Sequence, residues 1–205
     1  MTLEGLLRIA ESREKGPATT FERAHLLFAF INIGDNRTIG RGALAVQSGL
    51  GEGAVRTIIK KLRKDGFVET NASGCFLTPG GRRVYDSIWK KLSHIAVIRS
   101  SNLGMGGIQA AVAVRGNMKA VRYGIEQRDS AIRVGAAGAI TYIIKTGKIA
   151  IPGGSADCEE DYPDEAWSEL REELDPRNGD AVILCGAQQE TTAKLGALSA
   201  ALTIM

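Results

Sequence analysis

The sequence GEGAVRTIIKKLRKDGFVE, residues 51–69, decides the fold of the first part of the chain. On a helical wheel, residues 53–65 separate into an apolar side and a side that is almost wholly basic. The apolar side consists of Ala54, Val55, Ile58, Ile59 and Leu62, and the other side of Arg56, Thr57, Lys60, Arg63 and Lys64. This separation predicts an amphipathic helix with one face that packs in a core and one face that meets a polyanion.

A second, shorter helix is predicted just before this one. Residues 41–48 place Leu44 and Ala45 on an inward side, and the glycine-rich residues 48–51 break the chain between the two helices. An earlier helix at residues 21–33 would cover the other side of the small core. Two helices joined by a short turn that contains glycine are typical of a helix-turn-helix.

The residues that follow predict a β-hairpin and a closing helix. Gly66 is suited to end the basic helix, and residues 67–78 form two strands around a four-residue loop at 71–74. Thr78 and Pro79 are expected as the N-cap and the first residue of the closing helix. The inward side of that helix would carry Val84, Tyr85, Ile88, Trp89 and Leu92. The hairpin is therefore the wing of a winged helix-turn-helix.

Three pieces of this sequence, residues 50–56, 62–68 and 77–81, together resemble the core signature of prokaryotic winged-helix transcription factors. The whole chain resembles the archaeal winged helix-turn-helix transcriptional regulators with a C-terminal domain of unknown function, on the basis of residues 129–152 and 179–202. The resemblance implies sequence-specific binding of double-stranded DNA by the N-terminal part. It names no activity for the C-terminal part.

In a winged helix the basic helix enters the major groove, and its N-terminal residues reach base edges. Arg56 is the best candidate for reading a guanine, because a guanidinium can donate two hydrogen bonds to guanine O6 and N7. Thr57 and Glu52 are expected as shorter-range partners of the bases. The sequence thus predicts that residues 53–65 form the recognition helix.

The DNA backbone is expected to be held by four basic side chains, Arg41, Lys60, Arg63 and Lys64. Arg41 is included because it begins a helix, where anions are already favoured. The loop at residues 71–74 contains no Lys or Arg, so the wing is expected to make only polar phosphate contacts, through Asn71 and Ser73.

The distribution of charge predicts two domains. Residues 1–92 contain 15 Lys and Arg and 9 Asp and Glu, a net charge of +6, whereas residues 93–205 contain 11 and 14, a net charge of −3. Because a local excess of positive charge raises the affinity for a polyanion, residues 1–92 are predicted to be the DNA-binding domain. Residues 93–205 are predicted to be an effector-binding or dimerisation domain.

The second domain is predicted to be an α+β domain with a mostly antiparallel sheet, because short runs of Val, Ile and Ala alternate with helical patterns. The expected strands are residues 95–98, 110–114, 139–144, 148–151 and 181–184, with Thr146 and Gly147 as a tight turn. The expected helices are residues 118–127, 165–174 and 190–203. Gly196 and the alanines near it would let the last helix approach the sheet closely.

A small-molecule effector site is predicted where the last strand meets the last helix. Gly186, Gln188 and Gln189 would present amides and backbone N–H groups near a helix N-terminus, which suits a small polar or anionic ligand. A palindromic operator needs two reading heads, so a homodimer is expected. The apolar stripe of residues 3–10 either contributes to the dimer or packs within the chain, and the sequence leaves both open.

Several other readings find little support in the sequence. Residues 101–107 lack the Gly-Lys-Ser/Thr ending of a phosphate loop, and the acidic residues 157–165 lack the spacing of a calcium loop. We therefore expect no cofactor, no metal site and no catalytic residue. The three separated cysteines, and the lack of a leader or a long apolar run, lead us to expect a cytoplasmic protein that has no membrane partner.

Two alternative functions remain. The first is a metabolic enzyme with an appended winged-helix domain, as in archaeal riboflavin kinases, although the second half shows no recognisable nucleotide or flavin signature. The second is a winged helix used for protein contacts, which the Arg and Lys residues of the recognition helix argue against.

Overall fold

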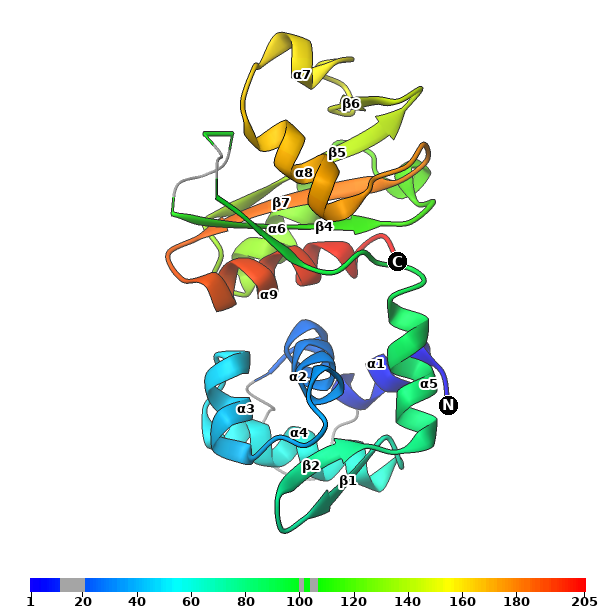
Figure 1. Ribbon diagram of the computed structural model, residues 1–205, viewed down its shortest axis with the longest axis vertical. Helices are drawn as coiled ribbons and strands as arrows, with labels where there is room; N and C mark the ends of the chain where they lie inside the picture. The colour runs from blue at the N-terminus through cyan, green and yellow to red at the C-terminus, as the bar shows by residue number, and fades with distance from the viewer. Residues whose placement is uncertain (12–20, 100–101, 104–106) are drawn as a thin grey trace. The chain divides into compact units, whose positions relative to one another are not determined.

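The structure is a computed structural model that describes residues 1–11, 21–99, 102–103 and 107–205. The chain divides into two compact units, Met1–Ile88 and Trp89–Met205 (Figure 1). The domain boundary predicted after residue 92 lies slightly further along the chain than this division. Most of the loop considered as a phosphate loop, residues 101–107, lies outside the described residues.

The described residues of unit 1 form four helices, a β-hairpin and a closing helix in the predicted order. These are α1 (Leu3–Glu11), α2 (Arg23–Asp35), α3 (Arg41–Ser48), α4 (Glu52–Lys64), β1 (Val68–Asn71), β2 (Gly74–Leu77) and α5 (Pro79–Ile88). The turn between α3 and α4 uses Gly49 in a left-handed conformation with φ of 65°, which a residue with a side chain rarely adopts. The N–H of Leu50 donates to the Ala45 carbonyl at 3.1 Å and completes the turn.

The last turn of α4 and the first turn of α5 are fixed by the residues that the sequence predicts. Gly66, with φ of 73°, follows α4, and the N–H of Phe67 donates back to the Leu62 carbonyl at 2.9 Å. At the start of α5, the Thr78 hydroxyl oxygen accepts a hydrogen bond from the N–H of Gly81 at 2.9 Å. Thr78 is therefore the N-cap of α5, as predicted.

The hairpin and the end of α5 differ from the prediction. Asn71 pairs with Gly74, so the hairpin loop contains the two residues Ala72 and Ser73 rather than four. The closing helix ends at Ile88, whereas it was expected to continue to Leu92. Leu92 instead forms a β-bridge with Val114 of the second unit. The side chain of Leu92 is buried against the sheet of the second unit. Its spacing from the other apolar residues also fits the buried side of α5, so the helical pattern alone could not distinguish the two positions.

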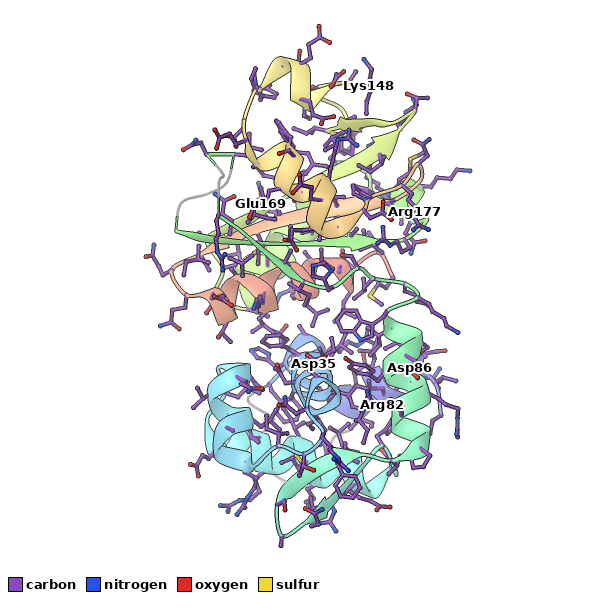
Figure 2. The ribbon with its side chains drawn as sticks, viewed as in Figure 1. Asp35, Arg82, Asp86, Lys148, Glu169 and Arg177 are labelled. Atoms are coloured by element: carbon purple, nitrogen blue, oxygen red, sulfur yellow. The ribbon has the colours of Figure 1, made fainter. Side chains whose placement is uncertain are left out.

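A tight contact holds α2 against α5. Gly34 faces the ring of Tyr85, and a Cβ added at Gly34 would lie 2.1 Å from Tyr85 Cδ2. The Tyr85 hydroxyl donates to the carboxylate of Asp35, and the guanidinium of Arg82 stacks 4.7 Å from the centre of the Tyr85 ring. Arg82 also donates to the Gly34 carbonyl at 3.0 Å; Figure 2 labels Asp35 and Arg82. The glycine is needed because the aromatic ring occupies the space of a side chain.

The first helix packs within unit 1. Leu6 and Ile9 are buried, and α1 contacts α2, α4 and α5. Lys61 of α4 is also buried; its ammonium donates to the Ile9 carbonyl at 3.2 Å and lies 5.6 Å from the ring centre of Phe21. Of the two roles left open for residues 3–10, packing within the chain is therefore observed.

Unit 2 is a five-stranded sheet with helices on both faces. Its elements are β3 (Ala96–Ile98), β4 (Ile108–Val114), a 3-10 turn at Met118–Ala120, α6 (Ile125–Arg133), β5 (Gly138–Lys145), β6 (Lys148–Ala150), α7 (Cys158–Asp161), α8 (Ala166–Leu174), β7 (Ala181–Ala187) and α9 (Glu190–Ala201). The strand order is β3-β4-β7-β5-β6, and each paired neighbour is antiparallel. Helices α6 and α9 cover one face of the sheet and α8 covers the other (Figure 1). The predicted α+β fold class is confirmed, because helices dominate the N-terminal unit and an antiparallel sheet forms the C-terminal unit.

Small residues let α9 approach the sheet, as predicted. A Cβ added at Gly196 would lie 2.5 Å from Cys185 Sγ and 2.9 Å from the Cβ of Ala136. Burial raises the pKa of the Cys185 thiol to about 12, so it stays protonated beneath the helix. The cysteines are free and buried.

One predicted helix of unit 2 is wrong and one predicted turn is confirmed. Residues 118–127 do not form a continuous helix, because Gly124 adopts φ of 77° and separates the 3-10 turn from α6. The turn between β5 and β6 consists of Thr146 and Gly147 with φ of 51° and 80°, which are the positive values of a tight hairpin turn. In the part of the chain that is described, no helix is long and apolar enough to cross a membrane.

We expect Gly34→Ala to destabilise unit 1 by about 1–3 kcal/mol, because the new methyl group must displace the Tyr85 ring from its contacts. Gly42→Ala is the matched control: Gly42 also lies in a helix, but a Cβ there meets nothing within 4 Å. The control should raise stability by about 0.5–1 kcal/mol. Urea unfolding followed by far-UV circular dichroism measures both, and equal effects of the two substitutions would contradict the contact.

We expect Lys61→Ala to lower the free energy of unfolding by about 1–3 kcal/mol, because the substitution leaves the buried Ile9 carbonyl without its ammonium donor. Arg63→Ala, on the exposed side of the same helix, should leave the denaturation midpoint nearly unchanged. The same urea experiment compares the two. An unchanged midpoint for Lys61→Ala would mean that the ammonium does not anchor α1.

Candidate nucleic-acid interface

A hollow of about 820 Å³ lies between α4, the start of α3 and the hairpin of unit 1. Its basic lining residues are Arg41, Arg56, Lys60, Arg63 and Lys64. The hairpin side is lined by Thr70, Asn71, Ala72, Ser73, Gly74 and Cys75, and Gly40 and Ile59 complete the wall. The hollow is thus cationic on its helical side and neutral on its hairpin side.

The basic side chains share one side of α4 because of their spacing. Arg56, Lys60, Arg63 and Lys64 occupy positions i, i+4, i+7 and i+8, which recur on one face of an α-helix. All of them are exposed, whereas Val55, Ile58 and Leu62 on the opposite side are buried. Burial of the apolar side therefore turns the basic side outward.

The charge of the hollow is available to an anion. Among the residues that the structure describes, Arg41, Arg56 and Arg63 make no ion pair with a carboxylate, and all three are exposed. The nearby acidic residues Glu52 and Glu69 do not line the hollow. A phosphate chain could therefore contact several guanidinium groups at once.

The hairpin forms a fixed wall. The side-chain oxygen of Asn71 accepts hydrogen bonds from the N–H groups of Ser73 at 2.9 Å and Gly74 at 3.1 Å. Behind the loop, the N–H and carbonyl of Cys75 pair with those of Ile39 at 2.9 and 3.0 Å. A Cβ at Gly74 would lie 2.3 Å from the Ile39 carbonyl oxygen. The wing is therefore held against the segment that leads into α3.

The structure brings together most of the predicted DNA-contacting residues, but not Glu52 or Thr57. Neither residue lines the hollow. Thr57 is half-buried, and its hydroxyl donates to the Gly53 carbonyl at 3.0 Å within α4. The hydroxyl proton of Thr57 is thus already used by the helix, which is a common arrangement for a threonine inside an α-helix. Glu52 is exposed in the first turn of α4, where its charge suits the helix dipole.

Sequence reasoning missed two features of the hollow. Thr70 lines it from β1, directly opposite Cys75, although alternation along the strand places Thr70 on the same side as the buried Val68. Cys75 itself lines the hollow although its side chain is buried, and its thiol donates to the Ile39 carbonyl at 3.2 Å. No signal in the sequence links residues 39 and 75.

The predicted effector site is not assembled as expected. Gly186 is buried inside β7, where it pairs with Gln109 on one side and Gly138 on the other, and its carbonyl accepts from the N–H of Ala137 at 2.8 Å. It therefore cannot present its backbone to a ligand, and β7 is longer than the strand expected at 181–184. Gln188 and Gln189 are exposed beside the start of α9.

The acidic residues after β6 are partly used in ion pairs. The ammonium of Lys148 lies 2.7 Å from the carboxylate of Asp157, and this hydrogen bond lowers the pKa of Asp157. The guanidinium of Arg171 donates from Nε to the Glu159 carboxylate at 2.7 Å. Within the described ranges, no group of three or more His, Cys, Asp or Glu residues could hold a metal ion.

The comparisons with known proteins concern both units. Residues 105–204 match the family model described as Domain of unknown function (DUF4443). A solved structure of a hypothetical protein from the archaeon Pyrococcus horikoshii OT3 is similar, with a TM-score of 0.71 and 27% sequence identity over 88% of this chain and 91% of that chain. No curated protein matches this sequence. The chain is thus similar to an archaeal protein over nearly its whole length, and its second unit is similar to a family without an assigned activity.

Proposed function

We propose that this protein is a sequence-specific regulator of transcription that binds double-stranded DNA through unit 1. The observation that carries the proposal is the hollow beside α4, in which five exposed Lys and Arg side chains converge on one wall. A surface of this charge attracts a polyanion, and release of counterions from DNA would supply much of the binding free energy. The winged helix-turn-helix arrangement supports DNA over other polyanions.

In this proposal α4 lies in the major groove. Arg56, near the N-terminal end of α4, donates two hydrogen bonds to a guanine and supplies sequence preference. Lys60, Arg63 and Lys64 lie further along the same face and contact phosphates, as does Arg41 at the start of α3. The wing contributes the hydroxyl of Ser73 and the amide N–H groups of Asn71, since the side-chain oxygen of Asn71 is already bonded within the hairpin.

We also propose that two copies of the chain bind together, because one recognition helix reads only a short half-site. Unit 2 would then sense a small molecule, form the dimer, or do both. The alternative function, an enzyme with an appended winged helix, is not favoured by any specific observation in the described part of the chain.

The experiment that tests the function is selection of bound sequences from a random duplex library by the purified full chain at fixed salt. Enrichment of a motif would support a sequence-specific regulator, and a palindromic motif would support the dimer. Binding that depends strongly on salt without any enriched motif would leave DNA as a nonspecific partner and contradict the regulator.

We expect Arg56→Ala to weaken binding to the selected site by about 1–3 kcal/mol and to relax the preference at one base pair, because a bidentate guanine contact is lost. Binding to unrelated duplexes should weaken much less. Fluorescence anisotropy with the selected site and its single-base variants measures both effects. An equal loss on all sequences would place Arg56 on phosphate instead.

We expect Arg63→Ala to weaken binding to all duplexes alike and to reduce the slope of log K against log salt by about 0.9, the value for one phosphate contact. Arg83→Ala is the matched control, because Arg83 is an exposed arginine of α5 that does not line the hollow. It removes the same charge from unit 1 and should change the slope little. Equal slopes for the two variants would mean that DNA binding depends on the net charge of unit 1 and not on a phosphate contact of Arg63.

A further inference from the structure

Unit 2 contains a small hollow beside the segment that follows α5. Its volume is about 350 Å³, and its lining residues come from three segments: Trp89, Leu92, Ser93 and His94; Arg115; and Glu173, Leu174 and Asp175. Small-molecule sites measure roughly 300–1,000 Å³, so a hollow at the lower end of this range suits a ligand smaller than a nucleotide.

The hollow combines an apolar floor with charges of both signs. Leu92 and Leu174 are buried, and the indole of Trp89 lies beside them. At the rim, His94 Nε2 and Glu173 Oε2 are 3.1 Å apart. The side chain of His94 is 58% exposed and that of Glu173 is 50% exposed. A ligand that enters this hollow would meet an aromatic surface and a charged rim together.

Arg115 provides the fixed positive charge. Its guanidinium donates at 2.8 Å to the carbonyls of Leu174 and Asp175 and to the buried carboxylate of Asp180. A guanidinium has five N–H groups, so these three bonds hold its position and leave two donors for a ligand. The ion pair with Asp180 also means that Arg115 is needed for the fold of this region.

Glu173 and Asp175 provide the negative charge. The hydrogen bond from Arg177 lowers the pKa of Asp175, so this carboxylate stays ionised at neutral pH. Glu173 accepts its hydrogen bond through Oε2 and Asp175 accepts from Arg177 through Oδ2, so the second oxygen of each carboxylate is placed to accept from a ligand. Donors and acceptors of opposite charge thus lie within one small hollow.

We propose that this hollow binds a small zwitterion of the α-amino-acid class with an apolar side chain. The carboxylate of the ligand is held by the remaining N–H groups of Arg115. Its ammonium group is held by Glu173 and Asp175, and its side chain packs on Trp89. A ligand with only one charge would make an ion pair with only one of the two sets of charged groups.

The segment that lines the hollow follows α5 directly in the chain, because Trp89 is the residue after Ile88. The N–H of Ser93 donates to the Ala113 carbonyl at 2.9 Å, and the N–H of Arg115 donates to the Lys91 carbonyl at 2.8 Å. These bonds fasten the segment that carries Trp89 and His94 to the end of β4, immediately after α5. A ligand held by this segment would stabilise it, so the proposed DNA binding would change with ligand concentration. This regulatory consequence rests on the proposed function, whereas the binding site does not.

The test is a titration of the full chain with each of the twenty common α-amino acids, followed by tryptophan fluorescence and by the melting temperature. We expect at least one apolar or aromatic amino acid to change the fluorescence and raise the melting temperature in a saturable way. Its N-acetyl and methyl-ester derivatives, which lack one charge each, should bind at least about tenfold more weakly. If no amino acid gives a saturable change, or if the derivatives bind equally well, the proposal is wrong.

Variants distinguish the hollow from another site. Trp89→Phe should remove the fluorescence response, because Trp167 is buried in the core on the α8 side of the sheet. Glu173→Gln should weaken binding about three- to tenfold, whereas Glu172→Gln, an exposed neighbour on α8 that does not line the hollow, should not. Equal affinities of these two glutamate variants would contradict the site.

A final measurement separates the site from its consequence. The amino acid that binds is added to the DNA-binding assay with the selected duplex. A change in DNA affinity that is lost in Glu173→Gln supports regulation through the hollow. Saturable amino-acid binding with unchanged DNA affinity, or with no DNA binding at all, supports the site and contradicts the regulatory consequence.

Discussion

The burial of one side of α4 is the constraint on which the rest of unit 1 depends. Val55, Ile58 and Leu62 pack into the core, and because an α-helix repeats every 3.6 residues, the basic side chains between them must face outward. Lys61 is a basic residue of α4 that faces inward, and its ammonium donates to the Ile9 carbonyl of α1. The orientation of α4 therefore determines which cations can meet a ligand and which serve the fold.

The hairpin turns this helical face into a hollow. Its position does not depend on the hairpin loop alone, because backbone hydrogen bonds join Cys75 to Ile39 just before α3. The close approach of Gly74 to the Ile39 carbonyl leaves no space for a side chain. As a result, the wing, the start of α3 and the outward side of α4 form one continuous surface with cations on one wall.

Unit 2 follows a different principle. Its central strand β7 is buried on both faces, and alternate residues of β4 serve the two sides: Ala111 and Ala113 pack toward α8, and Ala110 toward α9. On the α9 side the helix lies close to the sheet, because Gly196 leaves room for Cys185 of β7. The hollow near Arg115 lies just after the end of β4.

The sequence by itself determined the elements of this protein. The apolar and basic pattern of residues 53–65, the glycines at 49 and 66 and the Thr78-Pro79 pair set the helices and turns of unit 1, because their signals are local. The same holds for the strands of unit 2 and for the Thr146-Gly147 turn. The errors are also local: Gly124 was read through as helix, and Leu92 was read as part of α5.

Only the tertiary structure decided which residues share a site. The pairing of Ile39 with Cys75, of Leu92 with Val114 and of His94 with Glu173 joins positions far apart in the chain, and no periodicity reports such contacts. For this reason the cationic side of the hollow beside α4 was predicted from the sequence, whereas its hairpin wall and the roles of Thr57 and Gly186 were not. Local patterns fix secondary structure through backbone geometry, but a site depends on long-range packing, which a single sequence does not display.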